Sequence, residues 1–110
     1  MYAGTIQTTF EEREVLHRRA VAERLFAFGQ QVLDFARAYA APLAGRRDAP
    51  GKSAFNRQMD ILCRLARRFE RLASMAMGLE SLPVNRERLE ADVARVREVV
   101  VGLTLGTVDS

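Results

Sequence analysis

The sequence predicts an all-α protein: an antiparallel bundle of three long helices in one domain that covers residues 1–110. Apolar residues recur at alternating spacings of three and four along three separate segments, the pattern of helices with one buried face. No segment alternates with the period of two that is typical of a strand. The connections between the segments are short, which favours antiparallel neighbours with shallow crossing angles.

The first helix is expected to begin near Thr8 or Thr9 and to continue to Ala41. Each threonine has a glutamate three residues later, which is the capping-box pattern. Two neighbouring rows of apolar residues then follow, so we expect this helix to be the most buried of the three. Its length of about 34 residues is well above the usual 11–12. A kink near Gly29, or a break near Arg18–Arg19 that would give four helices, is compatible with this length.

The second helix is expected to begin at a Ser53 cap and to end between Gly78 and Leu82, ahead of Pro83. The preceding stretch, residues 42–51, is rich in glycine and proline, and we expect it to form a loop.

The third helix is expected to start after Asn85, whose side chain is a preferred cap, and to end at Gly102 or Gly106. We expect the two ends of the chain, residues 1–7 and 104–110, to be frayed tails.

Basic residues are concentrated in one part of the chain. Residues 46–71 hold eight cationic side chains against three acidic ones, whereas residues 1–45 are balanced and residues 72–110 are net acidic. At about 100° per residue, five of these cations lie within about 100° of one another along the second helix, over about 21 Å. The five are Arg57, Arg64, Arg67, Arg68 and Arg71, and the other three precede them at Arg46, Arg47 and Lys52.

These eight residues are the predicted nucleic-acid-binding site. The guanidinium group is always charged, and its fork of donors pairs with phosphate oxygens. No aromatic side chain interleaves the basic row, and there is no helix-turn-helix pattern, so we expect contacts to the backbone that are independent of base sequence. Two other interpretations are open. The row is a solvated surface partly neutralised by acids such as Glu23, Glu90 or Glu98, or it docks on an acidic protein or membrane surface.

No catalytic or cofactor-binding motif is present, and we expect no enzyme activity, no cofactor and no metal. Glu14 and His17 have the Glu-x-x-His spacing of di-iron bundles, but the chain has one histidine and such a site needs two. Cys63 has no partner thiol or histidine and is expected to fill space at the edge of the core. No apolar run is long enough for a membrane span, and residues 1–10 lack the pattern of a secretion signal, so we expect a cytoplasmic protein.

The helical class of the whole chain and the segment Lys52-Ser-Ala-Phe-Asn-Arg-Gln-Met-Asp-Ile-Leu62 carry one resemblance. The chain resembles the small all-helical subunits of multi-subunit CRISPR effector complexes, in which a helix can start with such a polar, arginine-bearing segment. Residues 82–110 do not contribute to the resemblance. It implies a non-catalytic scaffold that stacks with its neighbours and lines a nucleic-acid channel.

The sequence therefore predicts a non-catalytic helical subunit that binds nucleic-acid backbone and packs within a larger assembly. Protein subunits or self-association are expected, because the first helix is longer than its partners and would extend past them. The alternative is a protein–protein adaptor, a chaperone or a phage-type inhibitor that docks on an acidic partner.

Overall fold

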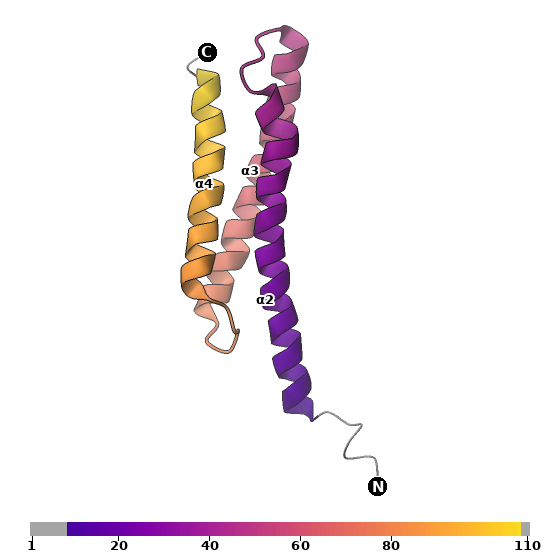
Figure 1. Cartoon of the computed structure of the whole chain (residues 1–110), viewed down its shortest axis with the longest axis vertical. Coiled ribbons are helices and arrows are strands. Elements are labelled where there is room, and N and C mark those ends of the chain that lie inside the picture. Colours follow the sequence, from indigo (N-terminus) through magenta and orange to yellow (C-terminus); the bar gives the residue numbers. More distant parts are fainter. Residues whose placement is uncertain (1–8, 109–110) are drawn as a thin grey trace.

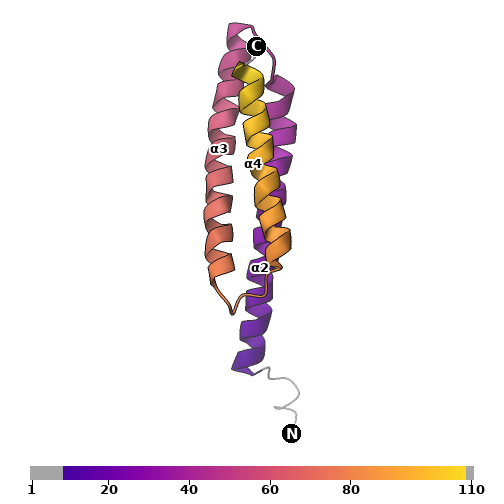
Figure 2. The ribbon, with the colours of Figure 1, turned by 90° about the vertical axis from the view of Figure 1, so that its left-hand side faces the viewer.

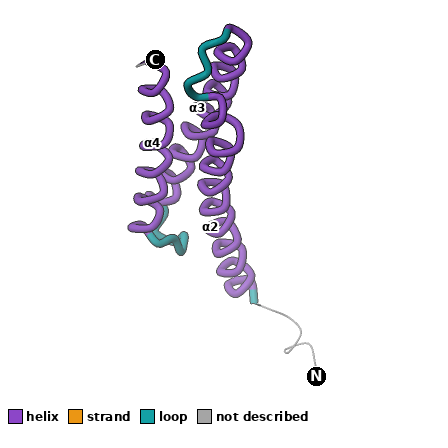
Figure 3. Tube along the Cα trace, turned by 45° about the horizontal axis from the view of Figure 1, so that its top comes forward, coloured by secondary structure: helices purple, strands orange, loops and turns teal. Residues whose placement is uncertain are grey.

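The protein is all-helical in the computed structural model, which describes residues 9–108. It has three long helices, α2 (Phe10–Phe35), α3 (Ala49–Gly78) and α4 (Arg86–Val108), and the described residues include no strand. The predicted all-α class is confirmed. The chain runs up α2, reverses into α3, and reverses again into α4 (Figure 1). Each long helix contacts the other two, and all are joined by short connections (Figure 3).

Helix α2 begins at the predicted capping box. The Glu12 backbone N–H donates to Thr9 Oγ1 at 3.1 Å, and the Thr9 N–H donates to Glu12 Oε2 at 3.4 Å. Thr9 is therefore the cap, and Thr8 lies outside the described residues. The helix is continuous across Arg18–Arg19, so the four-helix alternative is wrong.

The α geometry of α2 ends at Phe35, earlier than the predicted Ala41. A π-helical turn, Ala36–Ala40, and a 3-10 turn, Ala41–Leu43, follow it. Pro42 accounts for this change, because it has no N–H to donate and its ring would clash with the carbonyl oxygen four residues earlier.

Gly29 allows close packing and does not end or divide α2. A Cβ atom at Gly29 would lie 2.6 Å from Cζ of Phe69, inside the contact distance of two carbon atoms. The missing side chain therefore lets α2 approach the ring of Phe69, which is fully buried on α3.

Helix α3 begins earlier than predicted. Its cap is Asp48 and not Ser53, and residues 49–51, expected in a loop, form its first turn. The Asp48 carboxylate accepts a hydrogen bond from the Gly51 N–H at 3.0 Å. Pro50 suits this position, because the N–H groups in the first turn of a helix have no acceptor within the helix. The missing N–H of proline therefore costs no hydrogen bond there. The helix ends at Gly78, as predicted.

Helix α4 begins as predicted, because Asn85 Oδ1 accepts a hydrogen bond from the Arg88 N–H at 3.1 Å. It continues to Val108, so the predicted end at Gly102 or Gly106 is wrong. Glycine lowers helix stability by about 1 kcal/mol without preventing the helix. Residues 104–108 of the expected C-terminal tail are thus helical, whereas residues 1–7 and 109–110 lie outside the described part.

The core follows the inner faces of the three helices. Its largest fully buried side chains are Phe69, Leu62, Leu89, Val32 and Val96. Eight residues of α3 are buried, against seven in the segment predicted as the first helix (five in α2 and two in the π-helical turn), so the expectation that the first helix is the most buried is wrong. The reason is visible in Figure 2, where the first turns of α2 extend beyond α3 and α4. Ala22 is the first buried residue of α2. We call residues 10–20 the α2 overhang.

Candidate functional site

Five predicted site residues lie along the exposed face of α3, and we call them the arginine stripe: Arg57, Arg64, Arg67, Arg68 and Arg71. All five are exposed, whereas the apolar positions of α3 face the core. Four of the five, Arg57, Arg64, Arg67 and Arg71, form no ion pair with any carboxylate among residues 9–108. Their guanidinium groups are therefore available to an external anion.

Arg68 differs from the other members of the stripe. Its Cζ atom lies 6.0 Å from the centre of the Phe28 ring on α2. The Phe28 ring in turn meets Phe69 edge to face, with 6.0 Å between ring centres. A cation over an aromatic face is attracted by the ring's quadrupole. Arg68 is thereby held at the side of the stripe that faces α2.

Acidic residues do not neutralise the stripe through direct pairs. The carboxylate of Glu70 on α3 is bound by Arg97 of α4. Glu23, Glu90 and Glu98, which we considered as neutralising acids, make no ion pair with the stripe in the described structure. Asp60 is the acid within the stripe, at an exposed position between Arg57 and Arg64. It lowers the local positive potential without closing an ion pair.

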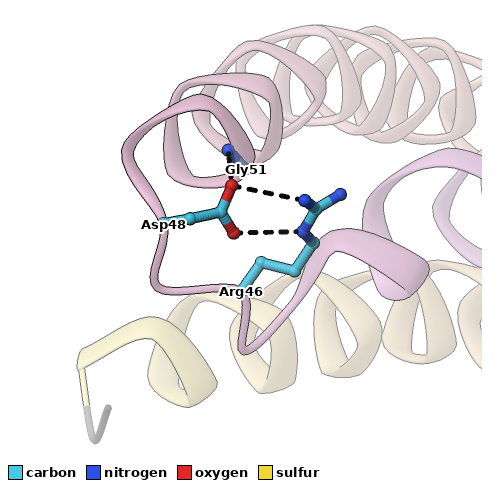
Figure 4. A network of polar contacts seen from close by, with 3 residues as sticks. All are labelled: Arg46, Asp48 and Gly51. Atoms are coloured by element: carbon cyan, nitrogen blue, oxygen red, sulfur yellow. Dashed lines mark hydrogen bonds and ion pairs between the residues drawn. The ribbon is translucent and has the colours of Figure 1, made fainter.

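Arg46 is occupied by a contact within the fold. Its Nε and Nη2 atoms donate to the two carboxylate oxygens of Asp48 at 3.3 and 3.2 Å, while Asp48 also caps α3 through the Gly51 N–H (Figure 4). A Cβ atom at Gly51 would lie 2.7 Å from Asp48 Oδ1 and 2.8 Å from Arg46 Nε, so glycine leaves room for this pair. The hydrogen bond from Gly51, followed by the contacts of Arg46, lowers the pKa of the Asp48 carboxyl below its ordinary value of 3.8.

Arg47 and Lys52 are exposed but do not extend the arginine stripe along its own face. Together with Arg46 they border a pocket of about 200 Å³ beside Phe55, at the start of α3. Lys52 precedes Arg57 by five residues, which places it about 140° around the helix axis from that residue. The eight predicted residues thus divide into a stripe of five and a separate group of three.

The remaining candidates for chemistry stay apart. His17 is exposed, and its neighbour Glu14 lies 3.8 Å from Arg18, the nearest atoms being Oε2 and Nη2. Cys63 is a free, half-buried thiol. Within residues 9–108, no group of three His, Cys, Asp or Glu side chains is placed to hold a metal ion. None of the described helices combines the length and apolar character needed to cross a membrane.

An apolar groove between α2 and α3 was not anticipated from the sequence. It has a volume of about 530 Å³, and apolar side chains form most of its lining. Its lining includes the charged residues Arg24 and Arg68, Val21, Leu25 and Phe28 of α2, Leu72 and Met75 of α3, and Leu79 directly after α3. Met75 and Leu79 are 61% and 54% exposed. The second apolar row of α3, Ile61, Leu65 and Leu72, indicated a wide apolar face, and Leu72 is the member of this row that lines the groove.

Comparison of the chain with models of known protein families, with curated proteins and with solved structures finds no match.

Proposed function

We propose that this protein is a non-catalytic subunit that binds the phosphate backbone of nucleic acids through the arginine stripe. In this proposal the antiparallel bundle is a rigid support for the stripe within a larger assembly. The observation that carries the proposal is that Arg57, Arg64, Arg67 and Arg71 are exposed on one helix and unpaired with the described carboxylates.

The alignment of the stripe supports an extended polyanion as the ligand. Like charges three or four residues apart, as in Arg64–Arg67 and Arg67–Arg71, repel each other by a few tenths of a kcal/mol per pair on an isolated helix. A linear array of phosphates relieves that repulsion all along the helix. At about 3.4 Å per base-pair step, the stripe of about 21 Å is as long as about six steps of duplex DNA.

The type of contact follows from the side chains present. Phe55 and Phe69 are buried on the core side of α3, so no aromatic ring on the stripe is available to stack on bases. Binding that relies on arginine and phosphate alone is independent of base sequence and strongly dependent on salt. The resemblance to small subunits of CRISPR effector complexes implies the same kind of contact, on the wall of a nucleic-acid channel.

The test is a titration of labelled generic DNA and RNA, followed by fluorescence anisotropy at several salt concentrations. Five phosphate contacts correspond to a slope of log affinity against log salt of about −4.5 on duplex DNA and about −3.5 on single strands. Arg64→Glu with Arg71→Glu is expected to abolish binding at moderate salt. Neither residue contacts another described side chain through an ion pair, so helicity by circular dichroism should not change.

The matched control is Arg19→Glu with Arg95→Glu, which changes the net charge by the same amount at exposed positions on α2 and α4. It is expected to retain most of the affinity. Equal losses of affinity in both double variants would show that binding depends on the net charge and not on the position of the stripe. Absence of binding by the wild-type protein at low salt would refute the proposal and favour the alternative, docking of the stripe on an acidic protein.

A further inference from the structure

Two neighbouring apolar features of α2 have no partner within the chain. The first is the α2 overhang, where Phe10 is 77% exposed and Leu16 is 58% exposed. The second is the groove between α2 and α3, which begins at Val21 and extends to Phe28. Both lie on the same helix and follow one another directly, so a partner that covers one comes close to the other.

One face of α2 connects the overhang to the groove. Phe10, Glu14, His17, Val21, Arg24 and Phe28 are spaced 4-3-4-3-4 and lie within about 80° of one another around the helix axis. This is the spacing of a coiled-coil seam, with apolar Phe10, Val21 and Phe28 and with polar residues at the other three positions. Val21, Arg24 and Phe28 line the groove, so the seam faces the groove at its upper end and solvent at the overhang.

We infer that a second copy of this chain occupies the groove, with the Phe10–Phe28 segments of the two copies paired in antiparallel orientation around a two-fold axis. The α2 overhang of each copy then covers the groove of the other. Such an interface is isologous, because both copies contribute the same surface and the contact closes on itself.

The register of this pairing follows from the positions of the seam residues. In an antiparallel pair with its axis level with residue 19, each residue faces the one at an equal distance on the other side. Phe10 then faces Phe28 of the other copy, and His17 faces Val21. The six seam residues thus form three different pairs across the interface. In each pair, the two residues come from different members of the two alternating seam positions, as antiparallel coiled coils require.

Charge complementarity supports the same register. The third pair places Glu14 of one copy opposite Arg24 of the other. Arg24 forms no ion pair with any other described residue, and Glu14 has the exposed neighbour Arg18 at 3.8 Å. This pairing of Glu14 with Arg24 occurs twice in the interface, once on each side of the two-fold axis.

Sedimentation velocity of the full chain over a range of concentrations tests the inference. The measurement is made at physiological ionic strength and without nucleic acid, so it does not depend on the proposed function. The wild-type protein is expected to show a reversible equilibrium between monomer and dimer. A monomer at all concentrations would overturn the inference and leave the groove to a different protein partner.

Phe10→Asp tests whether Phe10 lies in the dimer interface. Phe10 is exposed in the single chain, so the variant should keep its helicity while the dimer dissociation constant rises by about tenfold or more. Leu105→Asp is the matched control, since Leu105 is an exposed leucine on α4, outside the seam. A dissociation constant that Phe10→Asp leaves unchanged would contradict the pairing.

Charge exchange tests the register. Glu14→Arg and Arg24→Glu, each alone, place like charges in both copies of this pair and are expected to weaken the dimer. The double variant restores opposite charges, and its dissociation constant should return to within about threefold of the wild-type value. Losses that simply add in the double variant would show that the two residues do not face each other.

Discussion

Arg97 on α4 donates a hydrogen bond from Nε to the carboxylate of Glu70 on α3. This contact joins two helices that are 27 positions apart in sequence at these residues. The same contact holds the Glu70 carboxylate on the side of α3 that faces α4. Glu70 is therefore paired with α4 and not with the stripe, although Arg67 lies only about 60° from it around the axis of α3.

The contact between Arg97 and Glu70 is expected to contribute little to stability. The Arg97 side chain is 67% exposed, and exposed ion pairs are typically worth about 0–1 kcal/mol. Arg97→Gln should therefore lower the free energy of unfolding by less than about 1 kcal/mol, measured by urea denaturation. A larger loss would mean that the pair positions α4 against α3.

Asp60 is expected to weaken the proposed binding of polyanions. It is the acid closest to the centre of the stripe, between Arg57 and Arg64, so its charge repels phosphate. Asp60→Asn should raise the affinity for generic DNA by about twofold to fivefold at low ionic strength, with a smaller effect as salt increases. Asp92→Asn on α4 makes the same charge change away from the stripe. Comparable gains in the two variants in the anisotropy assay would argue against a local effect.

Gly29→Ala is expected to destabilise the protein although alanine favours helix. The new Cβ atom would overlap the buried ring of Phe69, and overpacking of this kind costs about 1–3 kcal/mol. The control is Gly102→Ala, where a Cβ atom meets nothing within 4 Å, so the helix preference of alanine alone should add up to about 1 kcal/mol. Opposite changes of the melting temperature are therefore expected. If Gly29→Ala instead stabilised the protein, α2 and α3 would be able to move apart at this point without a cost in free energy.

Asp48 is expected to make stability depend on pH in the acidic range. Its pKa is lowered in the folded protein by the Gly51 hydrogen bond and by Arg46, so the folded state favours the charged carboxylate. This stabilisation is fully present above the ordinary pKa of 3.8 and is lost as pH falls through the lower pKa of the folded state.

Asp48→Asn keeps an oxygen that can accept from the Gly51 N–H but removes the charge. The difference in melting temperature between wild type and variant should thus be present at neutral pH and shrink as pH falls below about 4. An equal difference at both pH values would show that the charge of Asp48 is not the source of the effect.

The local signals of the sequence were sufficient for the elements that depend on neighbouring residues. Thr9 and Asn85 mark helix starts because each accepts a backbone hydrogen bond within one turn. The start of α3 was misplaced, because Asp48 and Ser53 are both good caps and the glycine and proline residues between them suggested a loop. The choice between them depends on Arg46 and on the room left by Gly51, which a pattern of single residues does not contain.

The exposure of the arginine stripe was also predictable, since helix geometry places it opposite the apolar row. The sequence did not indicate where the residues of the neighbouring helices lie relative to the stripe. The contact of Arg68 with Phe28 depends on the distance between α2 and α3, and so does the groove. The greater burial of α3 depends on where the three helices overlap, whereas apolar periodicity describes each helix separately.

Helix α3, the longest of the three with 30 residues, is about 45 Å long, whereas the structure is only 24 and 15 Å across its two shorter axes. So narrow a cross-section holds little more than a single column of buried side chains. Phe69 and Leu62 lie near the middle of this column. Opening at one end then exposes few groups at the other, so the two ends can lose structure independently of each other. Amide hydrogen exchange should accordingly be slowest around Leu62 and Phe69 and accelerate gradually toward both ends, in place of a single protection level for the whole chain.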